Sequence, residues 1–130
     1  RYPDDVLILN NLVYTYTMRD KTVPLALEHL PRLAAEGASD PRVLDTLVVA
    51  NLEAGRYNDA ARLVRHLETV AEKGSRLWFR SELHRARIDL QRENREMARR
   101  RLRTILESTH GMPDEDVLQA NELLERAQGE

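Results

Sequence analysis

The stretch PRVLDTLVVANLEAGRYNDAARLV, residues 41–64, predicts two helices joined by a tight turn. Leu44, Leu47 and Val48 share one face of the first helix, because residues three and four positions apart lie one above the other. Gly55 follows this run, where a left-handed residue would end a helix. A second amphipathic run, which includes Val64, begins directly after Gly55. So short a link makes the two helices antiparallel neighbours.

The same helical spacing continues along the rest of the chain, and no stretch shows the alternation of a β-strand. The predicted helices are residues 4–19, 22–36, 41–54, 56–73, 76–93, 95–109 and 114–127. Helix ends are predicted where a left-handed residue could follow, at Gly37, Gly55, Gly74, Asn94 and Gly111. Helix starts are predicted by the capping residues Thr22, Asp40 and Ser75. Pro31 falls inside the second helix, where we expect a bend or a break.

A small residue near the start of each second helix indicates an internal repeat. Ala26, Ala60 and Ala98 are separated by 34 and 38 residues. A helix–turn–helix unit of about 34 residues cannot bury its apolar face alone, so stacked neighbours must supply the core. We therefore predict an all-α chain of about three antiparallel hairpins, at residues 4–37, 41–74 and 76–110, with a capping helix at 114–127.

Six residues of the middle hairpin carry a resemblance to a known family: Leu44, Leu47, Gly55, Tyr57, Ala60 and Val64. With partial copies in the other two hairpins, the chain resembles the tetratricopeptide repeat family over nearly its whole length. The run LNNL at residues 9–12 looks like the first helix of bacterial repeats of this family. The resemblance implies a right-handed α-solenoid that forms a single domain over residues 1–130. The position of Pro3 suggests that further repeats precede Arg1, so the chain would be the C-terminal part of a longer array.

The resemblance also implies a binding site. In this family the first helix of each repeat lines a concave groove that receives a peptide or a helix of a partner protein. The corresponding residues here are Asn10, Tyr14, Arg42, Asp45, Val49, Arg80, His84 and Arg87. The expected function is therefore a protein–protein interaction module within a larger multi-repeat protein.

The residue types argue against catalysis and against bound metal. The chain has no cysteine, and its four histidines show no spacing typical of metal ligands. It contains no nucleophile elbow and no glycine-rich phosphate loop, so we expect neither an enzyme nor a cofactor. No apolar run approaches the roughly 18 residues of a membrane span, so membrane insertion is not expected and a cytoplasmic location is the default.

The one anomaly is a concentration of arginine in residues 76–103, where ten arginines face four carboxylates, a net charge of +6. Residues 104–130 carry a net charge of −6, so the acidic last helix could match the basic one before it. Recognition of single-stranded RNA by this segment is a second interpretation. The net charge of the whole chain, −2, does not favour it, because RNA is itself negatively charged. A third interpretation is that the chain is a dimerisation or structural segment of a larger enzyme and associates with a second copy of itself. Phe79 is expected in the core, and Trp78 is either packing or a partner anchor.

Overall fold

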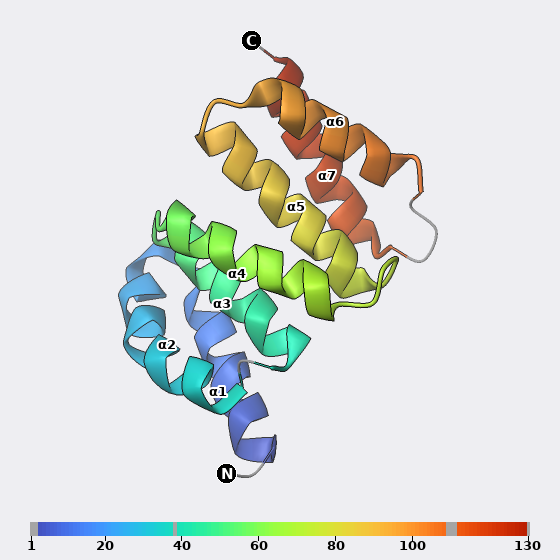
Figure 1. Ribbon diagram of the computed structural model, residues 1–130. Helices are drawn as coiled ribbons and strands as arrows, with labels where there is room; N and C mark the ends of the chain where they lie inside the picture. The colour runs from blue at the N-terminus through green and yellow to red at the C-terminus, as the bar shows by residue number, and fades with distance from the viewer. Residues whose placement is uncertain (1–2, 38, 109–111, 130) are drawn as a thin grey trace. The chain divides into compact units, whose positions relative to one another are not determined.

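The computed structural model describes residues 3–37, 39–108 and 112–129, and all regular structure in that part of the chain is helical (Figure 1). In chain order the elements are α1 (Pro3–Tyr16), the 3-10 helix η1 (Asp20–Thr22), α2 (Val23–Gly37), α3 (Pro41–Glu53), α4 (Tyr57–Val70), α5 (Arg76–Gln91), α6 (Arg95–Leu106) and α7 (Asp114–Gln128). The prediction of an all-α chain with seven α-helices and no strand is confirmed for these residues.

The chain forms two compact units. The first, Arg1–Val70, contains α1 to α4, and the second, Ala71–Glu130, contains α5 to α7. The boundary falls at the end of the second predicted hairpin. The first unit therefore holds the first two predicted hairpins, and the second holds the third hairpin with the predicted capping helix.

In the first unit α1 and α2 form one antiparallel pair and α3 and α4 form another (Figure 1). The helix α3 also packs against both α1 and α2, so the second hairpin stacks on the first. Ala26 and Ala60, at equivalent positions of α2 and α4, are fully buried. A small residue at such a place lets two helices approach closely, which explains its recurrence along the sequence.

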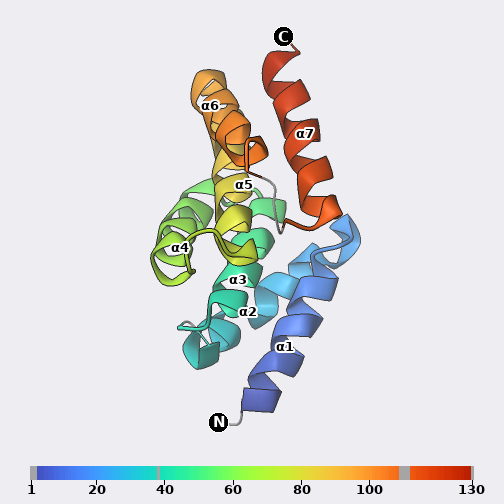
Figure 2. The same ribbon diagram turned by 90° about the vertical axis from the view of Figure 1, so that its right-hand side faces the viewer.

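In the second unit α5, α6 and α7 all pack against one another, and each runs antiparallel to the one before it (Figures 1 and 2). Their shared core is built from Phe79, Leu83, Ala86, Leu102, Ile105, Met112, Ala120 and Leu123. The core position predicted for Phe79 is thus confirmed. Trp78 is partly exposed at the edge of this core, with its ring 5.3 Å from that of Phe79 in an edge-to-face arrangement.

Two of the three predicted helix caps are confirmed. The Asp40 carboxylate accepts the backbone N–H of Arg42 at 2.9 Å and caps α3. Ser75 caps α5 by accepting the N–H of Trp78 at 3.3 Å. Each of these oxygens satisfies an amide that the first turn of a helix leaves without a carbonyl partner.

The cap predicted at Thr22 is wrong. Its hydroxyl donates to the carbonyl of Tyr16 at 2.7 Å, so it satisfies the last turn of α1 and not the first turn of α2. This bond and the 3-10 turn after it end α1 at Tyr16, three residues before the predicted end. The helices α4 and α5 also end early, at Val70 and Gln91 where we predicted 73 and 93.

Only some of the residues predicted to end helices in a left-handed conformation are confirmed. Gly55 and Gly74 have the predicted positive φ values, 78° and 86°. After α5, the left-handed residue is Glu93, with φ of 60°, and the prediction for Asn94 is wrong. Gly111 lies outside the described residues, whereas α6 ends at Leu106, three residues before the predicted end at 109.

Gly37 was predicted as a left-handed helix end, and this is wrong as well. It is the buried last residue of α2 and does not have a positive φ. A Cβ atom at this position would lie 2.8 Å from a methyl group of Val43 and 3.0 Å from one of Val6. Gly37 is therefore needed for the close approach of α1, α2 and α3.

Of the bend or break expected at Pro31, the break is absent, because α2 continues through this residue from Val23 to Gly37. Pro31 is exposed, so the carbonyl that loses its helical donor can face water.

Candidate functional site

Five of the predicted groove residues lie in the first unit, on α1 and α3, and these two helices contact each other. Arg42 is exposed and Tyr14 is partly exposed, whereas Asn10, Asp45 and Val49 are buried. The side-chain oxygen of Asn10 is buried and accepts no hydrogen bond from any described residue. The fold thus places the first helices of successive hairpins side by side.

The remaining three predicted groove residues, Arg80, His84 and Arg87, lie on α5 in the second unit. His84 is buried, and the two arginines are partly exposed. Nη1 of Arg80 lies 3.6 Å from Oδ1 of Asp116 on α7, and the two side chains are only 13% and 2% exposed. The charge of Arg80 is therefore matched inside the unit, which leaves it less able to bind an acidic ligand.

Asp116, in the first turn of α7, is the centre of a buried ion cluster. Nε of Arg76 lies 3.4 Å from its Oδ2, and Nη2 of Arg76 lies 2.8 Å from Oε1 of Glu115. A carboxylate this deeply buried requires matched charge, because removing it from water is costly. The amides of the first turn of α7 also favour negative charge. The cluster ties α7 to α5.

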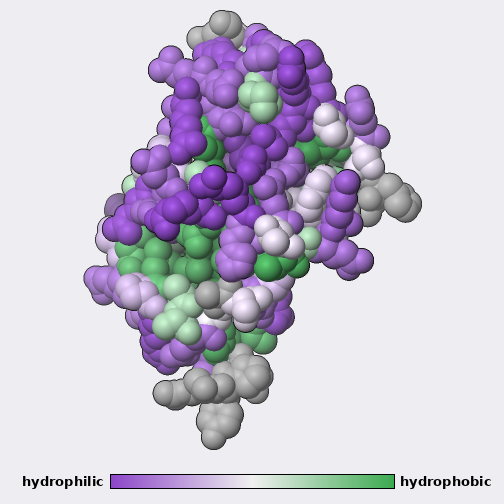
Figure 3. All heavy atoms as spheres, viewed as in Figure 1, coloured by the Kyte–Doolittle hydropathy of each residue, from purple (hydrophilic) through white to green (hydrophobic). Residues whose placement is uncertain are grey.

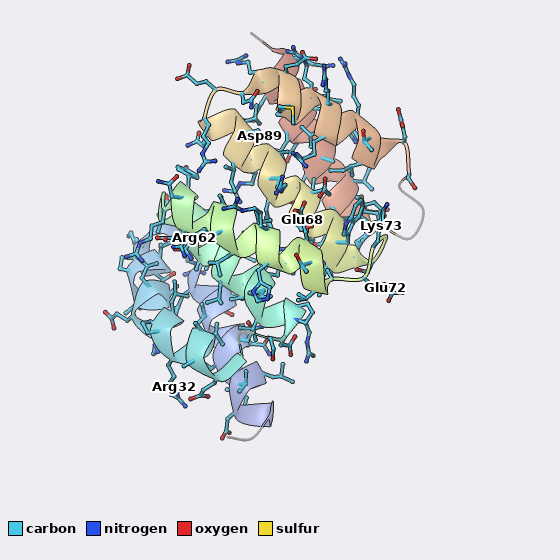
Figure 4. All side chains as sticks on the ribbon, viewed as in Figure 1. Arg32, Arg62, Glu68, Glu72, Lys73 and Asp89 are labelled. Atoms are coloured by element: carbon cyan, nitrogen blue, oxygen red, sulfur yellow. The ribbon has the colours of Figure 1, made fainter. Side chains whose placement is uncertain are left out.

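A second group of arginine contacts holds α6 in place. Nη1 of Arg101 lies 3.1 Å from Oε1 of Glu82, and its Nε lies 3.4 Å from Oδ2 of Asp89, both on α5 (Asp89 is labelled in Figure 4). Nη1 of Arg99 donates to the carbonyl of Ala127 at 3.2 Å, near the end of α7. These two arginines connect all three helices of the unit.

The contacts support the hypothesis that the arginine-rich segment is matched internally. Arg76 and Arg80 pair with carboxylates of α7, as expected of an acidic last helix. Two arginines of α6 differ from this pattern. The side chain of Arg100 is 72% exposed, and its nearest carboxylate is Glu96, at 3.4 Å. Arg103 is exposed and forms no ion pair with a described residue.

A groove runs between α5 and α6 on the surface of the second unit, and we name it the α5/α6 groove. One end is a pocket of about 230 Å³ whose apolar wall is Trp78, Phe79 and Ile105. The other end is a more open hollow of about 220 Å³ beside Met97, Arg100 and Arg101. Glu82 and Thr104 line both ends, so the two hollows adjoin each other. Most of the surface over α6 in Figure 3 is hydrophilic, with a few small hydrophobic areas.

The pKa values of the Asp40 and Glu96 carboxyls are both lowered by neighbouring arginines. The hydrogen bond from the Arg42 guanidinium lowers the pKa of Asp40, and that from Arg99 lowers the pKa of Glu96. A lowered pKa keeps a carboxylate ionised at neutral pH, which suits an ion pair better than proton transfer. No group of three or more His, Asp or Glu residues in the described ranges could hold a metal ion. None of the described helices is long and apolar enough to cross a membrane.

The chain has no significant match among protein-family models, curated proteins or solved structures. Its function must therefore be argued from its own residues.

The sequence analysis did not predict the α5/α6 groove. Its lining residues lie between positions 73 and 108 and come from two helices, the turn before α5 and Ser108 after the end of α6. Only Trp78, which the sequence left as either packing or a partner anchor, pointed to this part of the molecule. The rest depends on how far α6 stands from α5 at each position, which residue spacing does not reveal.

Proposed function

We propose that the chain is a helical-repeat module of the tetratricopeptide type that binds a protein partner. The observation that carries this proposal is the packing of the first unit, where α3 contacts both helices of the hairpin before it. Stacking of this kind buries one face of each hairpin and leaves a row of first helices as an extended surface. The full burial of Ala26 and Ala60 supports the repeat register derived from the sequence.

The partner would bind along α1 and α3 of the first unit, where Tyr14 and Arg42 are the predicted groove residues that reach solvent. Arg42 adds an exposed guanidinium on α3, next to the helix that carries Asn10 and Tyr14. A binding role requires neither an active site nor a cofactor, so we propose that the chain is not an enzyme.

Binding of nucleic acid is less well supported. Arg76, Arg80 and Arg101 pair with carboxylates, and Arg99 donates to a backbone carbonyl. These contacts leave less unmatched positive charge for phosphate groups, which dominate the affinity for nucleic acids.

A peptide-display selection on the purified chain tests the proposal, followed by calorimetry with the enriched peptides. We expect Tyr14→Ala and Arg42→Ala to weaken binding by about tenfold or more, because each removes a side chain of the proposed groove. Arg62→Ala is the matched control for Arg42→Ala, since Arg62 is an exposed arginine of the second helix of the same hairpin and also pairs with an aspartate (Figure 4). Peptides that bind equally well to all three variants, or the enrichment of no peptide, would overturn the proposal.

A further inference from the structure

None of the predicted groove residues is among those that line the α5/α6 groove, which is formed by the second unit alone. Its two ends differ in chemistry. The Trp78 end is the more enclosed and mainly apolar, with the hydroxyls of Thr104 and Ser108 and the ammonium of Lys73 around it. The Arg100 end is more open and has Met97 beside the charged residues Glu82, Arg100 and Arg101.

The size of the Trp78 pocket indicates what could enter it. Small-molecule and cofactor sites usually enclose about 300–1,000 Å³, whereas this pocket is about 230 Å³. Such a volume suits one bulky apolar side chain. Partly exposed tryptophan is also enriched where interfaces concentrate their binding energy, because its ring supplies a large rigid contact area.

The charges along the groove indicate what would flank that side chain. Among the described residues, Glu82 is the only carboxylate that lines it, and this group pairs with Arg101. Lys73 at one end and Arg100 at the other are both exposed. The ion-pair partner of Arg100 is the exposed Glu96, and Glu96 already accepts a hydrogen bond from Arg99 at 2.6 Å. The groove thus has one exposed cation beside the apolar Trp78 pocket and another in the adjoining hollow.

We propose that the α5/α6 groove binds a short acidic segment of a partner protein. A bulky apolar side chain of that segment occupies the Trp78 pocket, and its flanking carboxylates contact Lys73 and Arg100. This inference goes beyond the proposed function, because it concerns a second surface that does not involve α1 or α3. The module would then hold two segments, one along the first helices and one in this groove.

Trp78 provides a direct readout, because it is the only tryptophan in the chain. The probe is a synthetic peptide with one Phe between Asp and Glu residues and without Trp. We expect the peptide to shift the emission of Trp78 saturably, because the Phe ring displaces water from its surroundings. The same peptide with Ala in place of Phe should produce no shift. Added salt should weaken binding, since exposed cations attract the carboxylates.

Two exposed arginines of α6 form a matched pair of variants. Arg100 lines the groove, whereas Arg103 on the same helix does not. We expect Arg100→Glu to weaken peptide binding by about tenfold or more and Arg103→Glu to change it little. Thr104→Phe should block the groove where its two ends meet, and circular dichroism would show whether that variant remains folded.

Several results would overturn the inference. These are an unchanged Trp78 emission at millimolar peptide, an equal loss for Arg100→Glu and Arg103→Glu, or tighter binding of a single-stranded RNA oligonucleotide than of the peptide at this site. Tyr14→Ala separates this inference from the proposed function, because it should leave Trp78 binding unchanged. Peptides from the display selection whose binding depends on Tyr14 and not on Arg100 would support the proposed function. Their binding site would be the first surface, on α1 and α3.

Discussion

The two units of the chain are both helical but are held together by different interactions. In the first unit, α3 is buried along ten consecutive residues, Val43 to Leu52, and packs against α1, α2 and α4. In the second unit, the apolar core is joined by ion pairs that connect α5 to α6 and to α7. Apolar burial depends little on pH and salt, whereas a buried carboxylate depends on its charged partners. The two units should therefore respond differently to the same kind of substitution.

Loss of a core side chain should have the largest effect, and it should be confined to one unit. Leu33 and Leu102 are both fully buried, one in each unit. Leu33→Ala and Leu102→Ala should each lower the unfolding free energy of their own unit by about 2–5 kcal/mol. In urea unfolding, Trp78 fluorescence reports on the second unit, and circular dichroism reports on both. A Leu33→Ala variant that shifts the Trp78 transition as much as Leu102→Ala does would show that the units unfold together.

Removal of the buried carboxylate tests the ion cluster of the second unit. Asp116→Ala leaves Arg80, with a side chain only 13% exposed, without the Asp116 carboxylate. We expect a loss of about 3 kcal/mol, the low end of the range for breaking a buried pair, because Arg76 is half exposed and can turn to water. Asp114→Ala is the control, since Asp114 is an exposed carboxylate in the same helical turn. Similar losses for the two variants, measured by urea unfolding, would contradict a special role for the cluster.

The close packing at Gly37 makes a corresponding prediction for the first unit. Gly37→Ala should cost about 1–3 kcal/mol, because the added methyl group overlaps Val43. Val43→Ala in the same chain should reduce the penalty of Gly37→Ala, which a double-mutant cycle measures. Gly55 provides the contrast, because a side chain added there would meet no neighbouring atom. Only the backbone strain of its positive φ would oppose a substitution. Asn should therefore be tolerated at Gly55 and not at Gly37.

The smallest effect is expected at the cap of α3. Asp40→Ala should lower stability by about 1 kcal/mol, because the N–H of Arg42 loses its acceptor. The pKa of Asp40 is lowered in the folded state, so its stabilising charge is fully present above its ordinary pKa of 3.8. That contribution is lost as the pH falls through the lower, folded-state pKa. Thermal unfolding between pH 2 and 6 should show this difference between the wild type and Asp40→Asn, which retains an acceptor oxygen but does not titrate.

The local elements were largely predictable, since they depend on neighbours within a few residues. Asp40 and Ser75 were recognised as caps because a cap needs only one oxygen next to the first turn. Thr22 and Gly37 were misread because their partners, Tyr16 in one case and Val6 and Val43 in the other, lie six or more residues away. At the predicted site, Arg80 illustrates the same limit, because its partner Asp116 is 36 positions further along the chain.

The sequence by itself determined that the chain is helical, where most helices begin, and which alanines are buried between them. Apolar spacing and capping residues suffice for this, because helix formation is local. The tertiary structure alone decided which arginines are matched by carboxylates and which remain exposed. It also decided that Trp78 borders a pocket and that three helices approach one another closely at Gly37. Charge pairing, pocket volume and close contact all depend on distances between helices, and residues far apart in the chain set those distances only after it folds.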